Sequence, residues 1–236
     1  MSTAAHVAAQ LARVCLTERC PSCGGRTDAA FCAGCRADLA AIVQPCARCG
    51  LPQPVPRCPR RAGWLVERVI APFEYAPPLD GYLQALKFGH GRMLGRALAL
   101  LAAGPIAAHL AARAAPEVLV PVPLHRRRLV ARGYNQATEI ARTLSAAVRV
   151  PLDPAVAVRF EAATPQSRLG ARERRANVAH AFAVRGDVCG RRVAIVDDVI
   201  TTGATINALA AALVEAGALR VEAWAIARAV RQRLNT

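Results

Sequence analysis

The sequence predicts an α/β protein with a mostly parallel sheet, preceded by a small cysteine-rich module. Two observations lead to this prediction. Eight of the nine cysteines lie between Cys15 and Cys58. From Trp64 onward, short apolar runs alternate with segments of helical periodicity, which is typical of βαβ units. We therefore expect a module at residues 1–62 and an α/β domain at residues 63–236.

The module contains two neighbouring C-x2-C pairs. Cys20 and Cys23 form the first pair, and Cys32 and Cys35 form the second. Two such pairs supply four thiolates that can surround one zinc ion, and a site closed by four ligands leaves no position open for catalysis. The pattern predicts a structural Zn²⁺ site, with disulfides or redox chemistry as the alternative.

A third pair, Cys46 and Cys49, has an incomplete partner. Cys58 follows it, but Arg61 stands where a fourth cysteine is expected. Three ligands do not close a tetrahedral zinc site. Either Cys15 supplies the fourth ligand or this half of the module has lost its metal, and both alternatives stay open.

The α/β domain is expected to alternate strands and helices. A strand or the edge of a hairpin is predicted over residues 66–75. Further strands are predicted over 117–122, 155–160, 192–196 and 220–228, and helices over 79–88, 92–112, 135–148 and 205–215. The helix over 92–112 is expected to be interrupted at Gly104-Pro105. Asn135 is placed to cap the helix that follows it. Ligands of parallel sheets bind at the carboxyl ends of the strands, so the loops there are the candidate site.

Residues 193–205 are the most informative stretch of the chain. An apolar strand ends in the adjacent carboxylates Asp197 and Asp198. A turn into a helix follows, made of Thr201, Thr202, Gly203, Ala204 and Thr205. Its N–H groups, hydroxyls and the positive end of the helix suit a phosphate monoester, and the two carboxylates can accept hydrogen bonds from ribose hydroxyls. The unit therefore fits a ribose 5-phosphate.

Two further segments concentrate arginine near the strand ends. Arg126, Arg127, Arg128 and Arg132 crowd one predicted loop, where they are placed to meet a pyrophosphate. Residues 164–177, which include Arg168 and Arg174, form a polar segment just before the strand at 192–196. A solvated, charged surface is the alternative for both. Lys87 is the only lysine among 31 basic residues, which hints that a compact ammonium group is needed there.

Two stretches carry a resemblance to known families. Residues 193–205 resemble the 5-phosphoribosyl 1-pyrophosphate (PRPP) motif of type I phosphoribosyltransferases. The sequences PVPLHRRR (121–128) and RGYNQ (132–136) resemble the signature of the ComF family. That family joins a cysteine-rich zinc ribbon to a phosphoribosyltransferase domain, in the order found here. The resemblance implies the type I phosphoribosyltransferase fold, and Arg61 departs from the family's pattern of eight cysteines.

The resemblance also implies roles for individual residues. Asp197 and Asp198 would hold the ribose, and residues 201–205 would hold the 5-phosphate. Arg126, Arg127 and Arg128 would lie around the pyrophosphate, together with Arg168 and Arg174 on a loop that closes over the ligand. Lys87 is a further candidate for PRPP binding, and Mg²⁺ is expected to accompany PRPP.

The implied function is transfer of a phosphoribosyl group from PRPP to an unidentified acceptor, linked to DNA uptake in natural competence. The alternative is a non-catalytic accessory protein that handles single-stranded DNA or senses a nucleotide, with competence proteins as partners. The net charge of +15 suits either role. Neither a secretory signal nor an unbroken apolar span is visible in the sequence, which predicts a cytoplasmic protein without membrane insertion.

Overall fold

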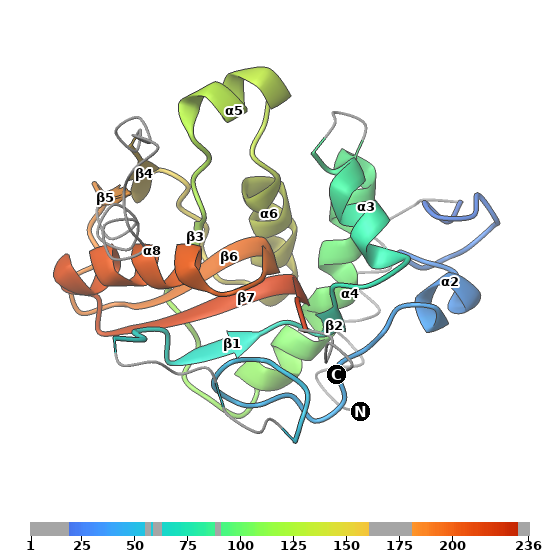
Figure 1. The fold of residues 1–236 in the computed structure, drawn as a ribbon, viewed down its shortest axis with the longest axis horizontal. Coiled ribbons are helices and arrows are strands. Elements are labelled where there is room, and N and C mark those ends of the chain that lie inside the picture. The colour runs from blue at the N-terminus through green and yellow to red at the C-terminus, as the bar shows by residue number, and fades with distance from the viewer. Residues whose placement is uncertain (1–18, 55–57, 59–62, 88–90, 161–180, 231–236) are drawn as a thin grey trace, which may run out of the picture.

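The computed structural model describes residues 19–54, 58, 63–87, 91–160 and 181–230 (Figure 1). The central sheet has five parallel strands: β1 (Arg68–Ile70), β2 (Phe73–Glu74), β3 (Val118–Pro121), β6 (Arg192–Ile200) and β7 (Arg220–Arg228). Their order is β1-β7-β6-β3, and β2 also pairs with β7, beyond the end of β1. This parallel sheet confirms the predicted α/β class. Residues 66–75 form two short strands rather than one.

The two central strands, β6 and β7, are each nine residues long. Residues 193–196 of β6 are buried on both faces of the sheet, as expected for a central parallel strand. The register pairs Asp197 with Ala225 and Ile200 with Arg228. The predicted strand over 192–196 is therefore too short, because pairing with β7 continues to Ile200. The two carboxylates lie within the strand, close to its carboxyl end.

Helices cover both faces of the sheet (Figure 1). On one face lie α4 (Arg92–Leu110) and α6 (Gln136–Val148), with α3 (Leu79–Ala85) beside them. On the other face lies α8 (Ala204–Glu215). The first face buries Leu98, Ile140 and Trp224, and the second buries Ile195 and Leu209. Alternating side chains of the strands fill both layers of the core.

α4 runs through Gly104-Pro105 without a break, so the predicted interruption there is wrong. A proline inside a helix removes the hydrogen bond to the carbonyl four residues earlier. Gly104 and Pro105 are both exposed, whereas Leu98 and Ile106 are fully buried. The missing bond therefore falls on the solvent side, and packing of the buried side keeps the helix continuous.

By its length and composition alone, α4 is also apolar enough to cross a membrane. Of its apolar window, 39% is buried inside the structure. A core helix that packs against a sheet passes the same test, so this property is weak support for a membrane span.

A small antiparallel hairpin stands apart from the main sheet. It pairs β4 (Ala157–Arg159) with β5 (Phe182–Val184), and β5 was not predicted. The N–H of Phe160 donates to the carbonyl of Ala181 at 3.0 Å, next to the paired residues Arg159 and Phe182. The predictions for residues 164–177, including Arg168 and Arg174, fall outside the residues that the structure describes.

The cysteine-rich module, which contains α2 (Ala33–Ala37), packs onto the α/β domain. The N–H of Ile42 donates to the carbonyl of Pro72 at 2.8 Å. Phe31 and Leu39 belong to the same buried cluster as Leu83 of α3. The two parts therefore share a hydrophobic core. Their division at residue 62 stays a prediction.

Asn135 lies at the start of α6, where the segment that leaves the sheet after β3 comes back to it. Its side chain accepts a hydrogen bond from the N–H of Ala137 at 3.0 Å and donates to the carbonyl of Val122 at 2.9 Å. The predicted cap of α6 is thus confirmed. The same side chain also ties the start of α6 to the end of β3.

We expect Asn135→Ala to lower the free energy of unfolding by about 1–2 kcal/mol, since it removes a helix cap. Asn135→Asp keeps the acceptor for Ala137 but loses the donor to Val122, so its loss should be smaller. Urea denaturation of the three proteins tests this order. An alanine variant as stable as the wild type would contradict the role of the cap.

Candidate functional site

The two carboxylates of β6 are adjacent and largely shielded from solvent. Asp197 is half-buried, and Asp198 is 7% exposed. The N–H of Asp198 donates to Oδ1 of Asp197 at 2.9 Å, and the N–H of Val199 donates to Oδ1 of Asp198 at 3.0 Å. Burial raises the pKa of Asp197 well above its usual range, the charge of Asp198 raises it further, and Arg159 opposes the rise.

The second carboxylate oxygen of Asp198, Oδ2, is buried and has no hydrogen-bond partner among the described residues. An unsatisfied buried acceptor costs about 1–3 kcal/mol. A hydroxyl group of a ligand would satisfy this oxygen. Carboxylate oxygens are also the ligands that Mg²⁺ prefers in proteins. The carboxylate pair therefore fits both a ribose and a magnesium ion.

Residues 201–205, here called the phosphate loop, lead from β6 into α8. Gly203 has φ +79°, a left-handed conformation that glycine adopts without strain, and it precedes the first residue of α8. Thr201, Thr202 and Ala204 are exposed. The loop therefore presents its backbone and hydroxyls at the positive end of a twelve-residue helix, which is a favourable place for an anion.

Trp64 and Asn207 support this loop, and neither was singled out in the sequence. The Trp64 ring packs on Gly203, where a β-carbon would lie 2.4 Å from Cη2 of the ring. Asn207 of α8 accepts from the N–H of Leu65 at 2.7 Å and donates to the carbonyl of Gly63 at 2.9 Å. These contacts hold the segment that follows the cysteine module against the phosphate loop.

The arginines expected on a loop lie on a short helix, α5 (Arg126–Arg132), so the predicted loop is wrong. His125 caps it by accepting from the N–H of Arg127 at 3.2 Å, and Gly133 ends it with φ +74°. No residue of α5 is buried. The helix projects from the carboxyl side of β3, and Figure 1 shows it standing clear of the sheet. Arg126, Arg127 and Arg128 are exposed there.

Arg159 at the end of β4 is the basic residue that interacts with the carboxylates. It is half-buried, and burial lowers its pKa, as does the positive charge of Arg128, while Asp197 opposes the change. Its guanidinium lies 5.4 Å from the centre of the Phe182 ring. The structure thus brings Arg128, Arg159 and Asp197 within electrostatic reach of one another. An arginine within an apolar strand was the available sequence signal.

Lys87 lies just beyond the end of α3 and is half-buried. The hydroxyl of Tyr134, in the RGYNQ stretch, donates to the carbonyl of Leu86. The guanidinium of Arg92 lies 5.1 Å from the centre of the Tyr134 ring. The segment that carries Lys87 is therefore attached to the turn between α5 and α6. A contact of Lys87 with PRPP stays a prediction.

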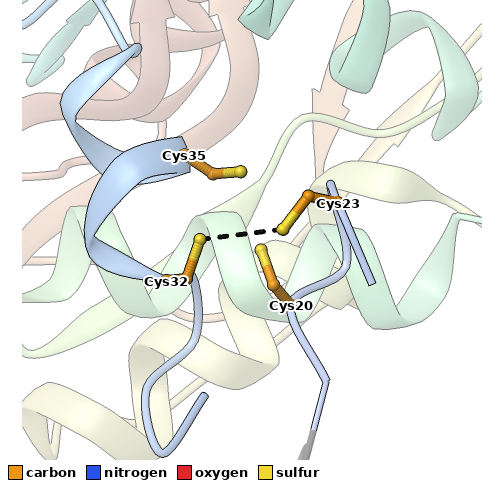
Figure 2. A group of neighbouring side chains, drawn as sticks. All are labelled: Cys20, Cys23, Cys32 and Cys35. Carbon is orange, nitrogen blue, oxygen red and sulfur yellow. Dashed lines mark hydrogen bonds between the residues drawn. The ribbon is translucent and has the colours of Figure 1, made fainter. Parts of the chain in front are cut away.

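Four cysteines of the module converge on one point (Figure 2). The sulfur atoms of Cys20, Cys23, Cys32 and Cys35 all lie within 4.8 Å of one another. The sulfurs of Cys23 and Cys32 are 3.7 Å apart. Tetrahedral zinc with bonds of about 2.3 Å places its sulfurs roughly 3.8 Å apart, whereas a disulfide bond is about 2.05 Å long. The spacing fits a zinc site.

The backbone at Cys20 favours the thiolate that a metal needs. Burial raises the pKa of this thiol, but N–H groups of Cys23, Cys32 and Ser22 outweigh that effect and lower the pKa to about 6. The carbonyl of Cys20 accepts from the N–H of Gly24 at 2.9 Å, and its N–H donates to the carbonyl of Gly25 at 2.7 Å. These two hydrogen bonds close the turn that carries Cys20 and Cys23, and such a turn with its cysteine pair is here called a knuckle.

The second cluster, made of Cys46, Cys49 and Cys58, is built in the same way. The carbonyl of Cys46 accepts from the N–H of Gly50 at 2.9 Å, and its N–H donates to the carbonyl of Leu51 at 2.7 Å. The three sulfurs lie within 4.8 Å of one another, and those of Cys46 and Cys58 are 4.0 Å apart. The geometry suits a metal with three protein ligands. A role for Cys15 falls outside the described residues.

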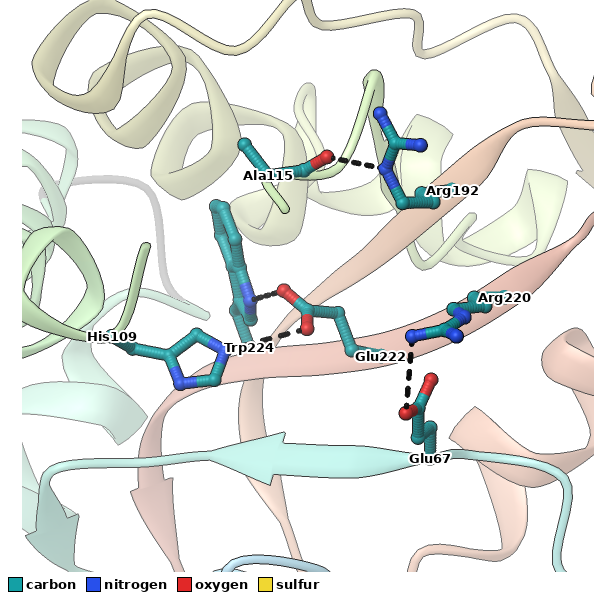
Figure 3. A network of polar contacts seen from close by, with 7 residues as sticks. All are labelled: Glu67, His109, Ala115, Arg192, Arg220, Glu222 and Trp224. Carbon is teal, nitrogen blue, oxygen red and sulfur yellow. Dashed lines mark hydrogen bonds and ion pairs between the residues drawn. The ribbon is translucent and has the colours of Figure 1, made fainter. Parts of the chain in front are cut away.

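Another charged cluster lies near the amino ends of β6 and β7, and Figure 3 shows its polar contacts. Residues of this cluster line a cavity of about 150 Å³. Many of its charges already have partners in the protein. Arg220 pairs with Glu67 at 3.7 Å, and Glu222 accepts from Nε1 of Trp224 at 2.7 Å and lies 3.6 Å from His109. The unsatisfied oxygen of Asp198 lies instead near the carboxyl ends of the strands, so we place the candidate site there.

The chain is similar to known proteins over most of its length. The family model of the phosphoribosyl transferase domain matches residues 129–235. DNA utilization protein YhgH of Escherichia coli K12 is 34% identical over 205 residues, which cover 86% of each chain. Competence protein F of Haemophilus influenzae is 32% identical over 210 residues, covering 84% of this chain and 85% of the relative. A purine phosphoribosyltransferase structure from Pyrococcus horikoshii is 17% identical, covers 64% of this chain and 82% of its own, and has a TM-score of 0.32.

Fold and site together define an α/β protein with a phosphoribosyltransferase domain and an amino-terminal cysteine-rich module. The chain belongs to the ComF family, that of competence protein F. This confirms the resemblance found in residues 121–136.

Gly203 offers a matched test of the Trp64 contact. Gly190 also has a positive φ, +69°, but a β-carbon there would meet nothing within 4 Å. Gly190→Ala should cost about 1–2 kcal/mol of unfolding free energy, from backbone strain alone. Gly203→Ala should cost more, because the Trp64 ring must move. In a Trp64→Ala background the excess should vanish. Urea denaturation of these variants measures it, and equal costs at both glycines would contradict the contact.

Asp197 should destabilise the protein when it is charged. Its pKa is raised on folding, so the stability that the neutral acid provides is present below its usual value of 3.8 and is lost as pH rises through the folded pKa. Asp197→Asn stays neutral throughout, and its advantage in Tm over the wild type should therefore grow between pH 4 and pH 7. Each kcal/mol gained in the free energy of unfolding raises the Tm by about 2–4 °C.

The control for this measurement is Asp187→Asn, since the Asp187 side chain is 75% exposed. Its effect should stay within about 0.5 kcal/mol. A difference between Asp197→Asn and wild type that does not change with pH would show that the carboxylate is not destabilised by burial.

Proposed function

We propose that the site at the carboxyl end of β6 binds a 5-phosphoribosyl ligand and transfers its phosphoribosyl group from PRPP to an acceptor. The observation that carries the proposal is the carboxylate pair three residues before the phosphate loop, in which Oδ2 of Asp198 has no hydrogen-bond partner among the described residues. A ribose 5-phosphate carries hydroxyls for the carboxylates at one end and a phosphate for the phosphate loop at the other. The phosphoribosyl transferase domain match supports the same ligand.

Each part of the site has a defined task in this proposal. Asp198 accepts a ribose hydroxyl, and Asp197 lies beside it. The N–H groups and hydroxyls of residues 201–205 hold the 5-phosphate. Arg126, Arg127 and Arg128 of α5 and Arg159 of β4 supply positive charge for the pyrophosphate. Mg²⁺ held near the carboxylates would neutralise charge on the pyrophosphate when it is bound.

In the transfer, the bond between C1 of the ribose and the pyrophosphate oxygen breaks, and its electron pair leaves with pyrophosphate. A bond forms between C1 and the nucleophilic atom of the acceptor, whose proton passes to solvent. The developing positive charge on the ribose favours a site that excludes water. We propose Arg168 and Arg174, from the segment bracketed by β4 and β5, for closure over the ligand.

The names of the relatives favour a second role, in the handling of DNA. We propose that the protein acts in DNA utilization in the cytoplasm, where single-stranded DNA and competence proteins are candidate partners. The exposed arginines of α5 are suited to contacts with phosphates of a nucleic acid. Zn²⁺ in the Cys20 cluster would stabilise the module without taking part in catalysis.

We expect PRPP with Mg²⁺ to raise the Tm of the wild type. A ligand at 100 times its Kd stabilises by about 2.7 kcal/mol, or roughly 5–10 °C for a protein of this size. Asp197→Ala with Asp198→Ala should abolish the shift, while Asp187→Asn should keep it. Differential scanning fluorimetry measures all three, and an unchanged Tm in the wild type would refute the proposed ligand.

Two further measurements separate the roles. Release of pyrophosphate that depends on an added acceptor supports transfer, whereas a Tm shift without release under any acceptor indicates sensing. Salt-dependent binding of a single-stranded oligonucleotide that survives the double alanine substitution indicates a DNA role independent of the carboxylates.

A further inference from the structure

Arg228, the last residue of β7, lies between the second cysteine cluster and the phosphate loop. Its side chain is almost fully enclosed, with the residue 3% exposed. Nε donates to the carbonyl of Cys49 at 2.8 Å. Nη1 donates to the carbonyl of Ile200 at 2.8 Å and also to that of Thr201. One guanidinium therefore joins the Cys46–Cys49 knuckle to the first residue of the phosphate loop.

Counter-charge for this guanidinium is scarce in the described part of the chain. Among the residues that the structure describes, no carboxylate forms an ion pair with Arg228. A buried charge without a counter-charge is costly. The contact of Arg228 with the second cysteine cluster runs instead through the carbonyl of Cys49.

A metal bound by the cluster would supply the missing counter-charge. Three thiolates around Zn²⁺ carry a net charge of roughly −1 (2 minus 3), which neutralises one guanidinium. The knuckle is also fixed in position. Gly50 has φ +69°, and a β-carbon there would lie 2.8 Å from Cγ1 of Val69 in β1. The carbonyl of Cys49 is therefore held at a set distance from the sheet.

We propose that Arg228 is a positioning residue that couples metal binding at Cys46, Cys49 and Cys58 to the conformation of the phosphate loop. The loaded cluster holds the guanidinium in place, and the guanidinium holds the carbonyls of Ile200 and Thr201. Loss of the metal releases this anchor and loosens the loop. The inference rests on the proposed function in one respect, namely that the loop binds the phosphate of a phosphoribosyl ligand.

The tryptophans provide a readout of the loop that needs no ligand. The chain has two, Trp64 and Trp224. Trp224 is fully buried, whereas Trp64 is half-buried and packs on Gly203 of the loop. Quenching of the intrinsic fluorescence by acrylamide therefore reports on Trp64. A loosened loop should expose this ring and increase quenching.

The experiment compares the full-length wild type with Cys46→Ser, Arg228→Met and the double variant. Zinc content per chain, acrylamide quenching and the Kd for ribose 5-phosphate are measured on each. Cys189→Ser is the matched control, because Cys189 is an exposed thiol outside both clusters. It should match the wild type in all three measurements.

We expect Cys46→Ser to lose about one zinc ion per chain, to show increased quenching and to raise the Kd about tenfold, which corresponds to about 1.4 kcal/mol. Arg228→Met should show the same increases in quenching and Kd. Since both act through one contact, the double variant should be no worse than the single ones. Additive effects, or wild-type quenching and Kd in Cys46→Ser, would overturn the coupling.

If Cys46→Ser does not fold, Arg228→Lys decides the question. Lysine keeps the charge but lacks the planar fork that reaches several carbonyls. It should keep the zinc content and show increased quenching and a raised Kd, and wild-type behaviour would overturn the proposal. If the wild type does not bind ribose 5-phosphate, the proposed function fails, while zinc content and quenching still test the coupling.

Discussion

The parallel pairing of β6 with β7 is the constraint on which the rest of the structure depends. Its register sets Asp197 beside Ala225 and Ile200 beside Arg228. The carboxylates, the phosphate loop and the guanidinium of Arg228 therefore meet at one edge of the sheet. A slip by one residue would turn every side chain of β6 to the other face. Such a slip would also move Asp197 and Asp198 to opposite sides of the sheet from those they occupy here.

The positive charge of the chain is arranged differently at the two edges. At the amino edge, Arg192 pairs with Glu117 at 3.4 Å and Arg220 pairs with Glu67 at 3.7 Å. These exposed ion pairs contribute little to stability but leave little net charge. At the carboxyl edge, the arginines of α5 are exposed on a helix without acidic residues. The field that attracts phosphates therefore arises at the same edge as the carboxylates and the phosphate loop.

Features of the site that depend on local sequence were predictable, and those that depend on long-range packing were not. The cysteine pairs, the two carboxylates and the phosphate loop are each recognisable because a short motif carries the chemistry. The arginines of α5 were assigned to a loop, although the helix lies between His125 and Gly133, two residues that can cap a helix. Trp64, Arg159 and Arg228 were missed, since each reaches the site from another part of the chain.

Two unfavourable buried groups lie beside the phosphate loop. Among the described residues, Oδ2 of Asp198 has no hydrogen-bond partner and Arg228 has no carboxylate partner. Each arrangement is unfavourable in itself, and under the two proposals a different bound species would relieve each, the phosphoribosyl ligand in one case and the metal in the other. Binding that satisfies such groups adds its free energy to that of folding. Under the two proposals, the geometry of the loop is tied to occupancy at both of its ends, and removal of metal and ligand together should loosen this edge the most.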